Sequence, residues 1–207
     1  MVTFLLCDTL PPIPAANPSK SSSKLKIPDL EYVMSPASFK EGTVGLLDKV
    51  SGMTLGVWQT RPKSYGYVKI NSKNIHEPPI INPNYLSDPY DVDVLLKSIR
   101  IGRNFLSTSS LQPYLNGQAN PSNDLQTDDE LLSWARNEGI TVYHMIGTAK
   151  MGHKSDKLAV VNNKLQVRGI ESLRIADASI MPTMPSGNTN APTMMIAEKA
   201  SDMILGK

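Results

Sequence analysis

Two dense blocks in the last third of the chain constrain its fold more than any other feature. The first is TVYHMIGTAKMG at 141–152, and the second is LRIADASIMPTMPSGNTNAPTMMIAEKASDMI at 173–204. Together they set a histidine beside a glycine, an aspartate after a short apolar segment, and an asparagine-rich turn before a helix that we expect at about 193–205. The apolar side chains that we expect this helix to bury are Met195, Ile196, Ala200, Met203 and Ile204.

Composition and residue spacing exclude several classes of partner and site. The chain has 207 residues, of which 40% are hydrophobic, enough for the core of one domain, or of one domain plus a fragment of another. A net charge of +2 without a basic cluster indicates no nucleic-acid partner. No two of the 13 glycines stand one residue apart, so the pyrophosphate-binding GxGxxG motif is missing. His144 and His153 have no third ligand at metal spacing and Cys7 is the single cysteine, so we predict no metal site.

The N-terminal segment does not read as a targeting sequence. MVTFLLCDTLPP has a short apolar run without basic residues, and Asp8 and two prolines interrupt that run. The chain also lacks a window of roughly 18 to 20 apolar residues that a spanning helix needs. The location stays open, with the cytoplasm or a peripheral membrane position favoured.

Local signals predict the order of the elements along the chain. Residues 1–26 are expected to form a loop or linker, rich in Pro, Ser and Lys, with ordered structure beginning near Ile27. The segments 54–60 and 65–71 are rich in β-branched and aromatic residues, and the RPKS turn at 61–64 predicts that they form an antiparallel hairpin.

Two helices and a set of short strands are expected after that hairpin. The first helix should span about 91–107, with Ser87 or Asp88 as its cap and Pro89 near its start. A capping box, Thr127 to Glu130, predicts a second helix that ends near Gly139. The sequence VVNNKLQVRGIESLRIAD predicts short strands joined by an Asn-Asn turn and by a turn at 168–172.

The two C-terminal blocks resemble the C-terminal end of the glucose-methanol-choline (GMC) family of FAD oxidoreductases. YHMIGT is similar to the active-site HxxGT of that family, and PSGNTNAPT is similar to the turn before its last helix. Weaker similarity at 27–32, 60–70 and 78–100 extends the resemblance over about 27–205. It implies an α+β fold with an antiparallel sheet and helices on one side as the substrate-binding domain, 27–152. Residues 153–207 would return to complete an FAD-binding domain.

The resemblance also implies roles for individual residues. His144 would be the base that takes the hydroxyl proton of an alcohol, a task that suits a neutral imidazole, and Asn188 would orient the alcohol. The FAD contacts would come from Asp177 and Ala178 and from the backbone of Thr189 and Asn190. An asparagine at 188 is more typical of the choline-dehydrogenase-like branch than of the glucose-oxidase branch.

Simpler readings of the same residues stay open. A histidine beside Tyr143 and Met145 is often a core residue, and Asp177 can cap a short turn into Ser179. The segment 186–188 can be a plain turn, with Asn190 capping the last helix.

The function implied by the resemblance is that of an FAD-dependent alcohol dehydrogenase or oxidase. Its partners would be a small alcohol and an electron acceptor, namely oxygen, a quinone or another carrier. The N-terminal portion of the family, which carries GxGxxG, has no counterpart here, so the chain would be part of a longer protein, one half of a split gene or a truncated product. The alternative is a non-catalytic remnant that cannot bind FAD without a separate N-terminal half.

Overall fold

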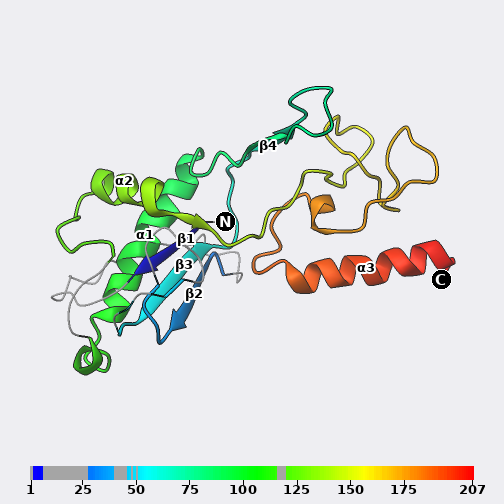
Figure 1. Cartoon of the computed structure of the whole chain (residues 1–207). Helices are drawn as coiled ribbons and strands as arrows, with labels where there is room; N and C mark the ends of the chain where they lie inside the picture. The colour runs from blue at the N-terminus through cyan, green and yellow to red at the C-terminus, as the bar shows by residue number, and fades with distance from the viewer. Residues whose placement is uncertain (1, 7–27, 40–45, 48, 50, 116–119) are drawn as a thin grey trace. The chain divides into compact units, whose positions relative to one another are not determined.

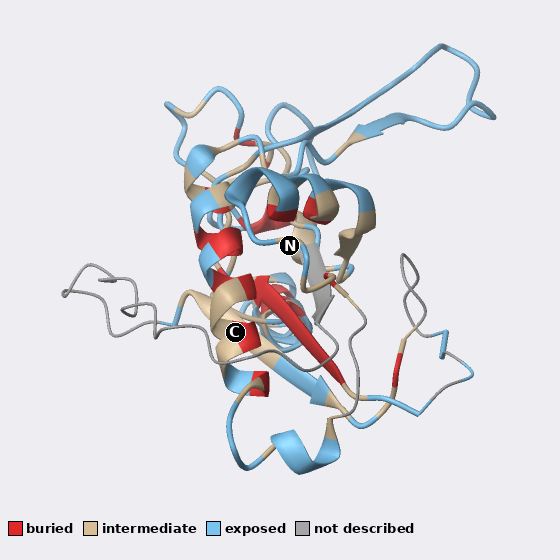
Figure 2. Cartoon of the chain, turned by 90° about the vertical axis from the view of Figure 1, so that its left-hand side faces the viewer, coloured by how far each residue is buried: buried red, intermediate tan, exposed pale blue. Residues whose placement is uncertain are grey.

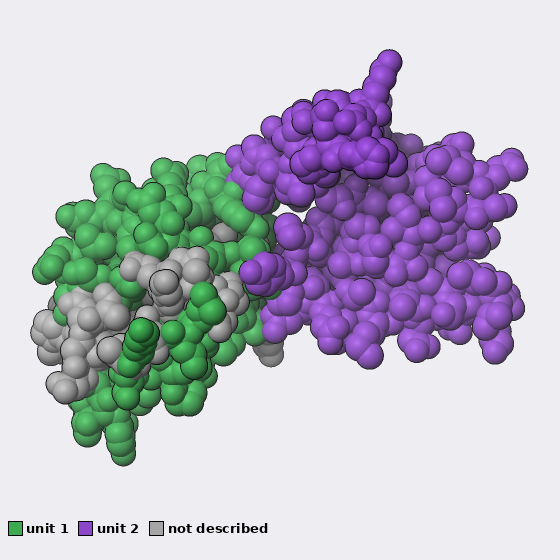
Figure 3. Space-filling model, viewed as in Figure 1, with its two compact units in different colours: residues 1–64, 85–142 green, residues 65–84, 143–207 purple. Residues whose placement is uncertain are grey.

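The structure is a computed structural model that describes residues 2–6, 28–39, 46–47, 49, 51–115 and 120–207 (Figure 1). The chain divides into two compact units (Figure 3). Unit 1 comprises Met1–Ser64 and Tyr85–Val142, and unit 2 comprises Tyr65–Asn84 and Tyr143–Lys207. The predicted limits at residues 27, 152 and 153 stay a prediction.

Unit 1 contains a four-stranded antiparallel sheet in the order β2-β3-β1-β6. The strands are β1 (Val2–Leu6), β2 (Leu30–Ser35), β3 (Thr54–Gln59) and β6 (Ile140–Thr141). In β3, Val57 lies opposite Tyr32 of β2 on one side and Phe4 of β1 on the other. The prediction that ordered structure begins near Ile27 is therefore wrong at β1, because this short apolar run supplies the strand between β3 and β6. Most of the expected linker, 7–26, lies outside the described residues.

The long helix of unit 1, α1 (Pro89–Leu106), confirms the helix predicted near 91–107. Asp88 is its N-cap, accepting a 2.8 Å hydrogen bond from the backbone N–H of Tyr90, and Pro89 occupies the first helical position. The second helix, α2 (Asp128–Glu138), has the predicted capping box between Thr127 and Glu130. A 3-10 turn, η1 (Gln112–Tyr114), lies between the two helices.

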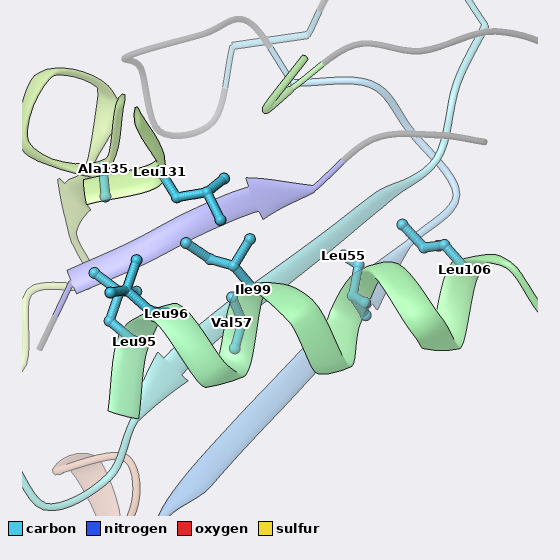
Figure 4. Close-up of a cluster of buried hydrophobic side chains, with 8 residues drawn as sticks. All are labelled: Leu55, Val57, Leu95, Leu96, Ile99, Leu106, Leu131 and Ala135. Carbon is cyan, nitrogen blue, oxygen red and sulfur yellow. The ribbon is translucent and has the colours of Figure 1, made fainter. Parts of the chain in front are cut away.

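Both helices pack against the sheet through one hydrophobic core (Figure 4). Figure 2 shows β3 buried along its length and buried bands on α1. Ile99 and Leu131 are fully buried at the centre of this core, and full burial of one such side chain contributes about 1.5–3 kcal/mol. The buried core residues are Leu55, Val57, Leu95, Leu96, Ile99, Leu106, Leu131 and Ala135.

A hydrogen-bond network around one carboxylate of the first turn of α1 ties the start of this helix to the segment that follows β3. Asp91 is 1% exposed and accepts hydrogen bonds from the backbone N–H of Lys63 (2.8 Å) and of Ser64 (2.7 Å). The Ser64 hydroxyl also donates to Asp91, and it accepts from the backbone N–H of Ser87 and of Asp88, each at 3.1 Å. The side chains of Asp91 and Ser64 thus accept hydrogen bonds from four backbone N–H groups of unit 1.

The predicted hairpin between 54–60 and 65–71 is wrong. In unit 2, β4 (Tyr67–Lys69) pairs with β5 (Ile80–Asn82), whereas β3 pairs with β1 and β2. The RPKS segment does not form the expected turn because its last two N–H groups bind Asp91. Gly66 fits the observed pairing, because a Cβ there would lie 2.0 Å from the carbonyl oxygen of Asn82.

The rest of unit 2 is a set of turns and single bridges that ends in a helix. The predicted short strands after residue 159 are only isolated bridges, at Met151–Val161, Val161–Val167 and Gln166–Arg174, while the turn at 168–172 is present, closed by the Val167 N–H on the Leu173 carbonyl. A 3-10 turn, η2 (Ala178–Ile180), precedes α3 (Asn190–Leu205).

Helix α3 packs on a second, smaller core and leaves much of its surface exposed. Ile196 and Ala200 are buried, and Met203 is partly buried against the same core. The buried members of this core are Val161, Leu165, Ile180, Met181, Ile196 and Ala200. The prediction that Met195 and Ile204 are buried is wrong, since they are 57% and 65% exposed. In the described residues, we find no helix with the length and apolarity that crossing a membrane requires.

Candidate functional site

His144 lies in an irregular loop whose path depends on unusual backbone angles. Tyr143, directly before it, has φ of 60°, and Gly147 has φ of +83°, a conformation that side chains disfavour. A Cβ at Gly147 would also approach the carbonyl oxygen of Met181 to 3.4 Å. The glycine of YHMIGT therefore lets the loop turn close to the segment around η2. His144 itself is partly buried, whereas Tyr143 is 66% exposed.

The His144 ring is held by one side chain from the start of α3. The Oγ1 atom of Thr189 lies 3.0 Å from Nδ1 of His144. Thr189 is 7% exposed, so this hydroxyl is shielded from water, and Asn188 directly before it is exposed. His144 and Thr189, 45 positions apart in sequence, thus meet in the fold, and the other predicted catalytic residue, Asn188, directly precedes Thr189.

Backbone hydrogen bonds fix the His144 loop to η2. The N–H of Ala149 donates to the carbonyl of Ser179 at 3.0 Å, and the N–H of Met151 donates to the carbonyl of Ile180 at 2.7 Å. These bonds place Asp177 and Ala178 beside the same loop. Asp177 is exposed, and its side chain accepts a 2.8 Å hydrogen bond from the backbone N–H of Ser179. It therefore caps η2, as the simpler reading of its sequence position expected.

The N-terminal end of α3 opens beside His144 without a counter-charge of its own. Thr189 is the N-cap but makes no side-chain capping bond, and the first turn carries no acidic residue. Asn190 is the first helical residue, so the reading of Asn190 as the cap is wrong, and the helix begins earlier than residue 193 because Thr193 already donates to the carbonyl of Thr189. The partial positive charge of this helix end is free to stabilise an anionic group.

The other histidines lie in different surroundings. His76 is exposed in the β4–β5 connection, and the Nδ1 atom of His153 lies 2.9 Å from the hydroxyl of Ser155. Among the described residues, no group of three or more His, Cys, Asp or Glu could hold a metal ion.

Sequence reasoning missed the side chain of Thr189. It assigned only the backbone of this residue to cofactor binding, because nothing in the run GNTN distinguishes a hydroxyl that faces a distant histidine from one that faces solvent. The contact joins two segments that are adjacent only in the folded chain.

Comparison with known proteins identifies similar sequences and structures. The profile of the GMC oxidoreductase family matches residues 62–197. The chain is 38% identical over 192 residues to alcohol dehydrogenase (acceptor) of Pseudomonas putida, which covers 91% of this chain and 34% of that protein. It is 42% identical over 146 residues to mitochondrial choline dehydrogenase of Mus musculus, which covers 70% of this chain and 24% of that protein.

Solved structures agree with these sequence matches. Pyridoxine 4-oxidase from Mesorbium loti superposes with a TM-score of 0.78 at 25% identity, over 87% of this chain and 35% of that one. A formate oxidase of Aspergillus oryzae gives a TM-score of 0.69 at 27% identity, over 77% of this chain and 28% of that one. The chain therefore spans about a third of the length of these proteins, or less.

Proposed function

Because the chain belongs to the GMC oxidoreductase family, whose members use FAD, we propose that it is the C-terminal, substrate-binding part of an oxidoreductase that acts on the CH–OH group of an alcohol. His144 is the catalytic base. The observation that carries this proposal is the 3.0 Å contact of His144 Nδ1 with Thr189, which holds the imidazole beside Asn188 and the uncapped start of α3.

In the proposed reaction an alcohol becomes a carbonyl compound by losing a proton and a hydride. When bound, FAD supplies the acceptor for the hydride that leaves the carbinol carbon. His144 takes the proton of the hydroxyl, because a neutral imidazole nitrogen has a lone pair that can accept it. Asn188, whose amide cannot take that proton, orients the alcohol by a hydrogen bond to its oxygen.

The described residues fit the anionic edge of a reduced flavin. The first turn of α3 has no acidic residue, so the backbone of Thr189 and Asn190 would offer a partial positive charge to such a group when it is bound. Asp177 and Ala178 lie at η2, next to the loop of His144, and are the other proposed cofactor contacts.

The substrate and the electron acceptor are proposed by class only. Relatives include an alcohol dehydrogenase and choline dehydrogenases, so a small alcohol of the choline type is the proposed substrate. Oxygen, a quinone or another carrier would reoxidise the flavin.

A second candidate is a fragment that binds no FAD without a separate N-terminal half. One observation favours it: among the residues that the structure describes, most of the large hydrophobic side chains that are exposed lie in unit 2. Ile70 and Ile75 are 88% and 91% exposed in the β4–β5 connection, and α3 exposes Met194 and Leu205. Such apolar surface is typical of a face that a further part of the protein covers.

A joined protein, made from this chain and part of a relative, distinguishes the two candidate functions. This chain would replace the matching C-terminal third of the Pseudomonas putida alcohol dehydrogenase, and loss of the oxidised flavin absorbance would be followed without oxygen after an alcohol is added. We expect alcohol-dependent reduction, and we expect His144→Ala to slow it by about a hundredfold to ten thousandfold while flavin stays bound. His153→Ala is the matched control and should reduce normally. Equal rates for the two variants would remove His144 as the base, and no reduction in any of them would favour the fragment.

A further inference from the structure

We propose that Thr189 is a positioning residue that fixes the tautomer of His144, so that Nδ1 carries the hydrogen and Nε2 presents a free lone pair. Both the role of Nε2 as the reacting atom and the placing of the hydrogen on Nδ1 rest on the proposed function. The tautomer can nevertheless be measured on this chain alone.

Only one of the two ring nitrogens of His144 is open to a substrate. Nδ1 of His144 lies 3.0 Å from Oγ1 of Thr189, a distance at which the two atoms share one hydrogen bond. Thr189 is 7% exposed, so no alcohol can reach this side of the ring without displacing it. Only Nε2 remains for a substrate hydroxyl.

The hydrogen of the neutral His144 ring must lie on the nitrogen that does not react. A neutral imidazole carries one N–H, and a nitrogen that accepts a proton must be the other one. With Nε2 as the base, the hydrogen is on Nδ1 and is donated to Oγ1 of Thr189. The hydrogen bond at one ring nitrogen sets the state of the other, which is how an orienting residue acts on a base.

Thr189 is itself held in place by hydrogen bonds to its backbone. Its carbonyl accepts two bonds from Thr193, one from the backbone N–H at 3.0 Å and one from the hydroxyl at 2.7 Å. These bonds are made in the first turn of α3, so the hydroxyl of Thr189 is presented from a regular helix end. A rigid support of this kind keeps the ring in one orientation.

The same chain contains an opposite case that serves as an internal reference. At His153, the backbone N–H of Ser155 donates to Nδ1 at 3.3 Å. A nitrogen that accepts a hydrogen bond cannot carry the hydrogen, so His153 should have its hydrogen on Nε2. We therefore expect His144 and His153 to adopt opposite tautomers in the same protein.

The test is long-range ¹H–¹⁵N NMR of the ring nitrogens in the whole chain, labelled with ¹⁵N-histidine and recorded at alkaline pH. His76→Gln and His144→Gln assign the three rings. We expect the Nδ1–H form for His144 and the Nε2–H form for His153. An Nε2–H form for His144 in the unaltered chain would overturn the proposal.

Three substitutions then isolate the hydroxyl. Thr189→Val keeps the shape and removes the oxygen, so His144 should change to the Nε2–H form, and Thr189→Ser should restore Nδ1–H. Ser201→Ala removes another hydroxyl of α3, one that donates to the carbonyl of Ala197, and it should change nothing. An unchanged His144 in Thr189→Val, or a changed one in Ser201→Ala, contradicts the role. No flavin or turnover enters this measurement, so failure of the joined protein to reduce flavin would count against the proposed function and leave the tautomer result standing.

Discussion

Replacing Asp91 by Ala should destabilise unit 1 far more than a change at a neighbouring acid of the same helix. The buried carboxylate accepts from the backbone N–H groups of Lys63 and Ser64 and from the Ser64 hydroxyl. Alanine leaves the two backbone groups without this partner, at about 1–3 kcal/mol for each. We therefore expect a loss of about 4 kcal/mol, a large share of the roughly 5–15 kcal/mol that stabilises a typical domain.

Urea denaturation followed by tryptophan fluorescence measures this loss. Trp58 and Trp134 are the two tryptophans of the chain, and both belong to unit 1. With a slope of about 2 kcal/mol per molar urea, the midpoint should fall by about 2 M. The matched control is Asp93→Ala, which breaks an exposed bond to Lys97 and should cost about 0.5 kcal/mol. If Asp91→Ala and Asp93→Ala unfold at the same urea concentration, the network does not hold the segment after β3.

Two further measurements use the same assay on unit 1. Ile99→Ala should lower the free energy of unfolding by about 2–5 kcal/mol, because Ile99 is fully buried at the centre of the first core and alanine leaves a cavity; a loss below about 1 kcal/mol would contradict the packing described. The pKa of Glu130 is lowered, first because the backbone N–H of Thr127 donates to its carboxylate, so its contribution is full above the ordinary value of 4.5 and is lost as the pH falls through the lowered value. The unaltered chain should therefore lose more stability than Glu130→Gln on acidification through this range, and parallel losses would exclude the capping carboxylate as the cause.

Elements encoded by neighbouring residues could be predicted from the sequence. Asp88 followed by Pro89 specifies the start of α1, and the Thr127–Glu130 box specifies the start of α2, because each signal acts within one helical turn. The apolar spacing that follows chooses the buried face, as Ile99 and Leu131 show.

Choices that depend on distant residues could not be predicted in the same way. Strand β3 pairs with β1, which lies far upstream in the sequence. The RPKS segment does not form the expected turn because it donates hydrogen bonds to Asp91, which lies in α1. The exposed face of α3 also differs from its sequence pattern. Its apolar residues suggest burial all along the helix, whereas the described core covers only the side with Ile196 and Ala200.

The candidate site was accessible to sequence reasoning only in part. His144 and Asn188 lie in two blocks whose sequences resemble those of a known family, so both could be predicted as site residues without coordinates. The side chain of Thr189 could not, because its contact with His144 depends on how the loop at Gly147 and the start of α3 come together.

The hydrogen bonds that the side chains of Asp91 and Ser64 accept also constrain the chain between β3 and α1. Lys63 and Ser64 lie where the chain leaves for residues 65–84, and Ser87 and Asp88 lie where it returns. Residues 65–84 thus form a loop whose two ends are held together by these hydrogen bonds. The entropy cost of closing this loop is offset by bonds within unit 1. Lengthening or shortening this loop should leave the register of β3 and the start of α1 intact, because the entropy cost of closing a loop changes only slowly with its length.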